Sequence, residues 1–268
     1  MSTLPHIYAV PAYGRSPHLE ACLRSLAAQT HPCPVVVSTS TPYDGLEALV
    51  QKHGAQLRVH GPNQGIGTDW NAALAHGEGG LVTVAHQDDL YDPGHCRAVV
   101  DAFAKFPDAL IAFCGYRELL GDSARPKNLL LWIKDIQIEM AFLGRRSIRS
   151  RGAKSRLLRF GNPIAAPGVT LNLARRPGFR FATGMRTNMD WDAWVRLARE
   201  PGAFVRVPGT LMSHRIHGGS ETTSCIADGY RRREDYDMFR AMWPAPVATV
   251  LSKLYAYGYG SNKEGEST

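Results

Sequence analysis

Strand-like and helix-like segments alternate through the first 115 residues, and this alternation restricts the fold more than any other feature of the chain. Short runs rich in β-branched residues, such as HIYAV at 6–10 and PVVVS at 34–38, are typical of strands buried on both faces. Amphipathic segments with apolar residues at helical spacing lie between them. The pattern predicts an α/β fold of Rossmann type, with a mostly parallel sheet and helices on both of its faces.

The regular alternation of strands and helices ends after Gly115, where loops and a basic run separate the predicted elements. We therefore expect residues 1–115 to form a nucleotide-binding half, residues 116–225 to complete the same domain, and residues 226–268 to form a helical tail. The predicted strands are 6–10, 34–38, 57–60, 81–85 and 109–115, followed by a strand, turn and strand from 203 onward. The first predicted helix starts at Ser16, and the others cover 46–50, 68–76, 92–105, 128–143 and 190–200.

Composition and the N-terminal sequence indicate the cellular compartment of the protein. No run approaches the ~20 apolar residues that a membrane span needs, and the N-terminus MSTLPHIYAV lacks the basic region and cleavage site of a signal peptide. The five cysteines are odd in number and have no paired spacing, which favours reduced thiols over disulfides or a zinc site. These features predict a cytoplasmic protein, with any membrane contact peripheral and at the inner face.

The net charge of +7 is concentrated in one place. Residues 145–159, RRSIRSRGAKSRLLR, hold seven arginines and lysines and no acid. Such a run can be a solvated surface, or it can bind a phosphorylated substrate or an anionic membrane. Few aromatic residues are interleaved for base stacking, so no nucleic-acid partner is expected.

Two adjacent aspartates follow the strand predicted at 81–85, in the stretch HQDDLYDP. Ligands of open α/β sheets bind beyond the carboxyl ends of the strands, and carboxylates there can hold a hard divalent cation. Position alone leaves other roles open, because Asp89 or Asp92 can cap the next helix and Asp88 can pair with an arginine. The glycines of GPNQGIG, in another loop at this edge, match neither the dinucleotide-binding nor the Walker spacing and favour a tight turn.

Six stretches in a fixed order, between about residues 6 and 222, decide between these alternatives. They are VPAYGR, SLAAQTHP, NQGIGTDWN, HQDDLYDP, MDWDAWVRL and HRIHGGSET. Together they resemble the family 2 glycosyltransferases of bacterial type, which have the GT-A fold. The resemblance implies an inverting, metal-dependent enzyme that moves a sugar from a nucleotide-diphosphate donor to a saccharide or lipid-linked acceptor.

The resemblance also implies roles for particular residues. Asp88 would ligate Mg²⁺ or Mn²⁺ that bridges the donor diphosphate, with Asp89 supporting it and His217 as a candidate further ligand; a plain surface histidine is an equal reading of His217. Tyr13 would stack or pack on the base. The expected donor-binding residues are Pro11, Tyr13, Arg15, Asp44, Asn71, His86 and Asp88.

Asp190 is the expected general base. By the same resemblance, an aspartate ahead of the tryptophan-containing helix takes the proton of the acceptor hydroxyl, a task that suits a carboxylate. Asp192 is expected to be a helix cap or an exposed partner. We expect Trp191 and Trp194 to pack in the core.

Three departures from the family pattern leave a second reading open. Residues 38–41 replace the usual base-reading aspartate, His86 replaces the first aspartate of the D-x-D motif, and Trp70 and Met189 replace an arginine and an acid. A catalytically degraded nucleotide- or sugar-binding protein of the same fold is therefore the alternative. A nucleotidyltransferase fits less well, because VPAYGRSPHL lacks the glycine-rich loop with arginine and lysine that such enzymes need.

Overall fold

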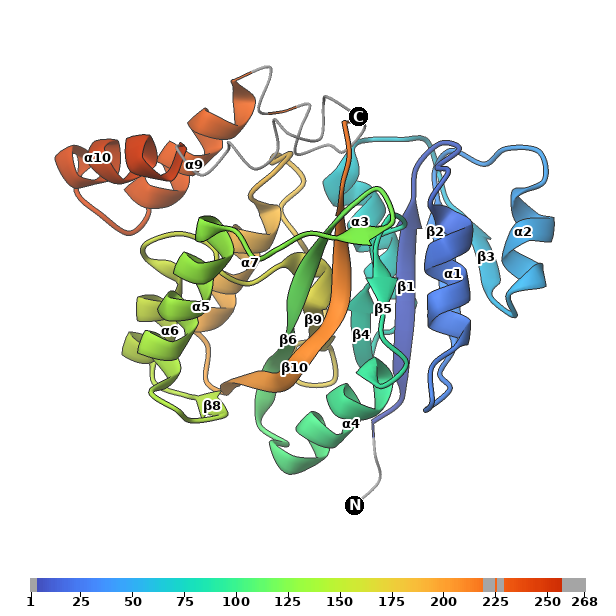
Figure 1. The fold of residues 1–268 in the computed structure, drawn as a ribbon, viewed down its shortest axis with the longest axis horizontal. Coiled ribbons are helices and arrows are strands. Elements are labelled where there is room, and N and C mark those ends of the chain that lie inside the picture. The colour runs from blue at the N-terminus through green and yellow to red at the C-terminus, as the bar shows by residue number, and fades with distance from the viewer. Residues whose placement is uncertain (1–3, 219–224, 226–228, 257–268) are drawn as a thin grey trace.

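The computed structural model describes residues 4–218, 225 and 229–256. One sheet with helices on both faces forms its centre (Figure 1). In chain order the elements are β1 (His6–Ala12), α1 (Leu19–Ala27), β2 (Val35–Thr39), α2 (Leu46–Lys52), β3 (Gln56–Val59), α3 (Ile66–Ala75), β4 (Leu81–Val84), β5 (Leu90–Tyr91), α4 (His95–Lys105), β6 (Ala109–Leu120), β7 (Ser123–Ala124), α5 (Leu129–Phe142), β8 (Ser147–Ile148), α6 (Arg151–Leu158), η1 (Ala166–Gly168), β9 (Val169–Asn172), α7 (Met189–Ala198), β10 (Ala203–Ile216), α9 (Tyr230–Arg240) and α10 (Ala245–Ala256).

The sheet has the strand order β3-β2-β1-β4-β9-β6-β10-β5. The strands β3, β2, β1 and β4 are parallel, as are β6 and β10. Short β9 runs antiparallel between β4 and β6 and joins the two parallel blocks. The predicted α/β architecture is confirmed, and the carboxyl ends of β1, β2 and β4 meet at one edge, as a parallel sheet requires.

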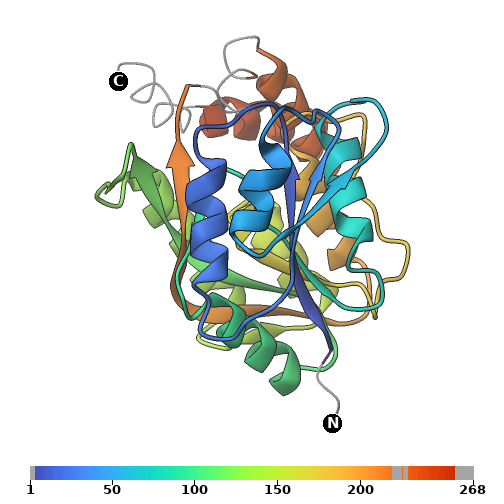
Figure 2. The ribbon, with the colours of Figure 1, turned by 90° about the vertical axis from the view of Figure 1, so that its right-hand side faces the viewer.

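Two hydrophobic cores lie on the two faces of the sheet. Strand β1 contributes to both, because Tyr8 and Val10 point into one core and Ala9 into the other. Helices α1, α2 and α4 bury their apolar sides in the first core, and α3, α6 and α7 in the second. Figure 2 shows α1 and α3 on opposite sides of the parallel strands. The central strands β2, β4 and β9 are therefore buried on both faces and do not alternate between apolar and exposed polar residues.

Two predicted elements differ in extent from the structure, and one strand was not predicted. Helix α1 begins at Leu19 rather than Ser16, because the Ser16 hydroxyl accepts a hydrogen bond from the His18 N–H (3.2 Å) and closes a turn first. Strand β10 is one bent strand over 203–216, not a strand, turn and strand. A bulge around Gly209 (φ +91°) absorbs the Pro-Gly pair and shifts the register against β6. Strand β9 lies in a segment that was expected to be irregular.

Two helices occupy the part of the tail that the structure describes. Helices α9 and α10 follow each other with a break near Trp243, and Phe239 and Ala248 are buried in the second core. The tail residues 257–268 lie outside the described residues. Within the described part of the chain, no helix combines the length and the apolar character needed to cross a bilayer.

Lys154 shows that part of the basic run is structural. Its side chain is fully buried, and its Nζ donates to the carbonyl oxygens of Glu200 (2.6 Å) and Gly202 (3.1 Å). Substitution by methionine leaves both carbonyls without this donor. We expect Lys154→Met to lower the free energy of unfolding by about 2 kcal/mol, measured by urea denaturation. The exposed Arg156→Met on the same helix is the control, and an equal loss there would contradict this account.

Candidate active site

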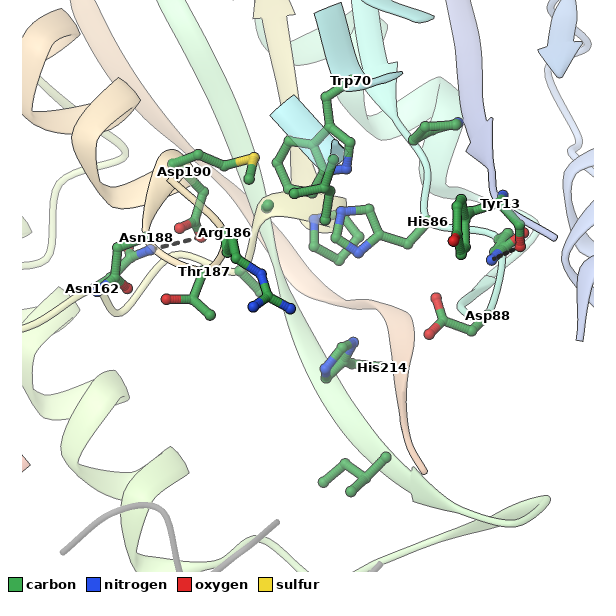
Figure 3. Close-up of a pocket in the computed structure, with 18 of the residues that line it drawn as sticks. Tyr13, Trp70, His86, Asp88, Asn162, Arg186, Thr187, Asn188, Asp190 and His214 are labelled. Atoms are coloured by element: carbon green, nitrogen blue, oxygen red, sulfur yellow. Dashed lines mark hydrogen bonds between the residues drawn. The ribbon is translucent and has the colours of Figure 1, made fainter. Parts of the chain in front are cut away.

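A cavity of about 580 Å³ opens beyond the carboxyl ends of β1 and β4. Figure 3 shows Asp88 and Asp190 on opposite sides of it, with His214 between them. Its donor-side lining comes from the loops after β1 and β4 and the start of α3, and its other side comes from α5, η1, α7 and α9. The predicted site residues that line it are Pro11, Tyr13, His86, Asp88, Asp190 and His217.

Asp88 lies in the tight turn that follows β4, where the chain leaves the sheet. The Nε2 of His217 lies 2.8 Å from its Oδ2. Burial acts to raise the pKa of Asp88, but the hydrogen bond with His217 and the neighbouring His86 and His214 outweigh it and lower the pKa to about 2. Asp88 is therefore an ionised carboxylate facing the cavity at any physiological pH.

The donor atoms around Asp88 fit a small divalent cation. One ligand atom each from His86, Asp88 and Asp89 lies within 4.8 Å of the others, and a carboxylate–imidazole set suits Mn²⁺ or Mg²⁺. Asp89 is fully buried and does not line the cavity. Its carboxylate accepts from the Arg215 N–H (2.9 Å) and lies 3.0 Å from Nδ1 of His214. The buried Asp89 therefore contacts its neighbours on β10, whereas Asp88 and His217, the other two expected metal ligands, line the cavity.

Two histidines on this side of the cavity differ in charge at pH 7: His86 is neutral and His214 is cationic. Burial lowers the pKa of His86, so its imidazole is neutral at pH 7. Burial also acts to lower the pKa of His214, but the carboxylate of Asp89 beside it raises the pKa to about 9. The cavity consequently presents an imidazolium from β10, a favourable neighbour for an anionic ligand.

Two of the residues that depart from the family pattern, Trp70 and His86, contact each other. The rings of Trp70 and His86 lie 4.8 Å apart, and the edge of Trp70 packs on Phe181 at 5.1 Å. The bulk of Trp70 thus occupies space beside the position where His86 replaces an acid. The two replaced residues pack against each other, so the change at position 70 and the change at position 86 are structurally coupled.

Asp190 is placed on the opposite side by the first turn of α7. Its Oδ1 accepts from the Trp191 N–H (2.7 Å) and its Oδ2 from Nδ2 of Asn162 (2.8 Å). Burial raises the pKa of Asp190 to about 6, although these hydrogen bonds and the cations Arg231 and Lys134 oppose the rise. The carboxyl therefore combines an ionised state at pH 7 with a proton affinity above that of ordinary aspartate, as a general base requires. Of the two candidate roles for its neighbour Asp192, the structure favours the partner role, because Asp192 pairs with Arg196 (2.7 Å).

Glu234 of α9 is a residue that the sequence analysis missed. Its carboxylate accepts from the N–H groups of Arg186 (2.7 Å), Thr187 (2.9 Å) and Asn188 (2.9 Å), and from the Thr187 hydroxyl (2.6 Å). The adjacent Asp235 accepts from Nδ2 of Asn188 (2.6 Å). The tail thereby fixes the loop that leads into Asp190. No motif marks this role, because the acidic pair lies in a helix more than 40 residues away in sequence.

We call the hydrogen bonds that Glu234 accepts from residues 186–188 the Glu234 clamp. Loss of this clamp is expected to lower both the stability and the turnover of the protein. Glu234→Ala leaves one buried and two partly buried backbone N–H groups without this acceptor, so we expect the free energy of unfolding to fall by about 3 kcal/mol. We also expect kcat to fall, because the loop before Asp190 loses its support. Thermal denaturation and initial rates measure the two effects. Asp237→Asn, exposed on the same helix, should change neither; wild-type values for Glu234→Ala would contradict the clamp.

Tyr13 lies at the rim of the cavity. It is exposed, and Gln87 holds its backbone through both of its amide atoms (3.1 and 3.2 Å).

Three predicted donor contacts do not line the cavity. Arg15 donates to the carbonyl of Asp44 (2.9 Å), away from the lining. The amide of Asn71 is used on both sides by the backbone of Phe181 (2.7 and 3.0 Å), so it fixes the loop before α7 instead of facing a ligand.

Comparison with known proteins agrees with this architecture. The family model described as glycosyl transferase family 2 matches residues 8–168, more than half of the chain. No curated protein matches. The matched range includes β2, β3 and β4, most of β1, and the loop that carries Asp88.

Solved structures are similar over nearly the whole chain. S. aureus TarS (residues 1–349), in complex with UDP-GlcNAc, has a TM-score of 0.64 at 15% identity, covering 96% of this chain and 73% of that one. The mannosyltransferase PcManGT from Pyrobaculum calidifontis, in complex with GDP-Man and Mn²⁺, has a TM-score of 0.62 at 18% identity, covering 97% and 71%. At these identities the structures establish a shared fold. With the family match, they show that this chain belongs to glycosyl transferase family 2 and has its GT-A fold.

Proposed function

We propose that the protein is an inverting, metal-dependent glycosyltransferase that uses a nucleotide-diphosphate sugar as donor and a saccharide or lipid-linked molecule as acceptor. One observation carries the proposal. A low-pKa carboxylate, Asp88, and a raised-pKa carboxylate, Asp190, line one cavity from opposite sides. Carboxylates whose environments separate their pKa values are typical of a site with divided roles.

The donor side is suited to a nucleotide diphosphate. Asp88 and His217 would hold Mg²⁺ or Mn²⁺, which when bound supplies charge neutralisation for the departing diphosphate. The imidazolium of His214 adds a fixed positive charge near the same position. Tyr13, at the rim, offers an exposed ring to the base, and Pro11 contributes to the wall beside it.

The acceptor side is built around Asp190. Its carboxylate would accept the proton of the acceptor hydroxyl as that oxygen attacks the anomeric carbon of the donor. The hydrogen bonds from Asn162 and the Trp191 N–H fix its orientation, so the reacting oxygen is held in line. Lys134, Arg186 and Arg231 line the same side, and this positive lining favours an acceptor that carries an anionic group such as a lipid diphosphate.

The test is a panel of nucleotide sugars with UDP, GDP, CMP and dTDP carriers, assayed with Mn²⁺ for release of the free nucleotide. We expect one carrier to be used well above the others, with slow hydrolysis in the absence of an acceptor. Added lipid-linked and free saccharides then identify the acceptor class by the acceleration they cause. Binding of a carrier without release or transfer for any sugar would support the degraded binding protein instead.

A further inference from the structure

Helix α5 carries an unusual stripe of exposed apolar side chains. Six of its large apolar residues, or of those just after it, are between 50% and 75% exposed. Spacings of three and four residues place them on one side of the helix. A scattered exposed leucine is normal, but a contiguous apolar stripe marks an interaction surface. The stripe consists of Leu129, Trp132, Ile133, Ile136, Met140 and Leu143.

An arginine-lined groove continues the stripe at its C-terminal end. The groove has a volume of about 480 Å³ and lies between the end of α5 and the start of α6. Leu143 belongs to both features, so they are continuous. Of its three arginines, Arg149 pairs with Asp108 (2.7 Å), whereas Arg145 and Arg156 are exposed. No acidic residue occurs between 145 and 159.

We propose that the apolar stripe and the arginine groove together form a membrane-docking surface that binds an anionic phospholipid bilayer. A helix that lies in the interface inserts tryptophan and aliphatic side chains between lipids while basic residues meet the headgroups. The charge distribution favours this occupant over a second copy of the chain, whose net charge is also positive. The arginines supply attraction to phosphates, and the stripe supplies apolar burial.

The position of α5 gives the surface a consequence for the active site. Leu130 and Lys134, on the inner side of the same helix, line the catalytic cavity. Figure 1 shows α5 and α6 at the end of the sheet away from α1 and α2. Docking through α5 would therefore hold the acceptor side of the cavity at the lipid surface, where a lipid-linked acceptor is found. This last step rests on the proposed function; the binding itself does not.

Trp132 provides a direct reporter for the test. Of the five tryptophans, Trp132 is exposed (56%), while Trp70, Trp191 and Trp194 are buried and Trp243 is half-buried. The full-length protein is mixed with vesicles of phosphatidylcholine, with or without phosphatidylglycerol, and measured by flotation and tryptophan fluorescence. We expect recovery with the anionic vesicles, together with a blue shift of the emission that is absent in Trp132→Phe.

Three surface variants separate the contributions. Trp132→Gln/Ile136→Gln should abolish flotation, and Arg145→Gln/Arg156→Gln should weaken binding by about fivefold per arginine at low salt. The matched control is Arg58→Gln/Val59→Gln, which removes one exposed arginine and one exposed apolar side chain from β3, at the far edge of the sheet. It should float like the wild type. All three variants change exposed side chains, so their thermal stability should match that of the wild type.

Equal recovery with and without anionic lipid, or an unchanged emission spectrum, would overturn the proposal. So would a lipid-free dimer that Trp132→Gln/Ile136→Gln converts to a monomer, because the stripe would then be a protein interface. Flotation is measured without donor or acceptor, and Asp190→Asn should float like the wild type. Failure of the transferase proposal and failure of membrane docking are therefore distinguished.

Discussion

Replacement of Asp190 by asparagine is expected to lower kcat by about 10²–10⁴-fold, the range that general-base catalysis contributes. Asparagine keeps the size of the side chain and the acceptor oxygen for the Trp191 N–H, but it cannot take a proton. Donor binding depends on the opposite side of the cavity, so calorimetry with the nucleotide diphosphate should give an unchanged Kd. Asp192→Asn, two residues along the same helix, is the matched control and should keep nearly full turnover.

The pH dependence of the rate gives a second measurement on the same residue. A base with a pKa of about 6 is protonated below that pH, so the wild-type kcat/KM should fall as the pH decreases through about 6. The acid limb should be absent from the residual activity of Asp190→Asn. A loss of less than about tenfold in kcat, or an acid limb that persists in the variant, would contradict the assignment of Asp190 as base.

Stability should change in the opposite direction to activity. Because the pKa of Asp190 is raised in the folded state, from 3.8 to about 6, the folded protein binds this proton more tightly than the unfolded chain does. Its contribution to stability is therefore present at low pH and is lost as the pH rises to about 6. Asp190→Asn removes an unfavourable charge at pH 8 but also loses the acceptor for Nδ2 of Asn162, so its melting temperature should stay close to that of the wild type. Inactivity through unfolding is thereby excluded.

Much of the fold and both carboxylates could be predicted because their signals are local. β-Branched runs predict the buried parallel strands, and polar residues after such a strand lie at the ligand-binding edge. The position of Asp88 after β4 therefore predicts that it lies at this edge, and the family resemblance supplies its expected role. Asp190 was predicted from the family resemblance of the stretch MDWDAWVRL, which forms the first nine residues of α7. The prediction that Trp191 and Trp194 are core residues is also confirmed, since both are buried.

The remaining features depend on contacts between distant segments. Strand β9 has four residues and pairs with strands about 60 and 90 positions earlier in the chain, so no local pattern identifies it. Asn71 was expected to face the donor, and its motif does not reveal that the Phe181 backbone uses both of its amide atoms. Glu234 was missed for the same reason: its partners are backbone N–H groups, which leave no residue-type signal.

The second large effect is expected for Asp88. Asp88→Asn removes the negative charge from the carboxyl that faces the cavity beside His217, and a neutral amide is a much weaker ligand for Mg²⁺ or Mn²⁺. We expect the affinity for the nucleotide diphosphate in Mn²⁺ to fall by about a hundredfold or more, beyond the loss caused by mutation of groups that only support a ligand. Chelation of the metal by EDTA should weaken wild-type binding to the same level.

Calorimetry of nucleoside diphosphates with and without Mn²⁺ measures this effect, with Asp101→Asn, exposed on α4, as the control. The variant should bind equally weakly in Mn²⁺ and in EDTA, because the carboxylate and the cation act as one unit. If Asp88→Asn instead retained Mn²⁺-dependent binding, another group, such as the buried Asp89, would have to be the ligand. If wild-type binding did not respond to the metal, the low pKa of Asp88 would reflect only its histidine neighbours.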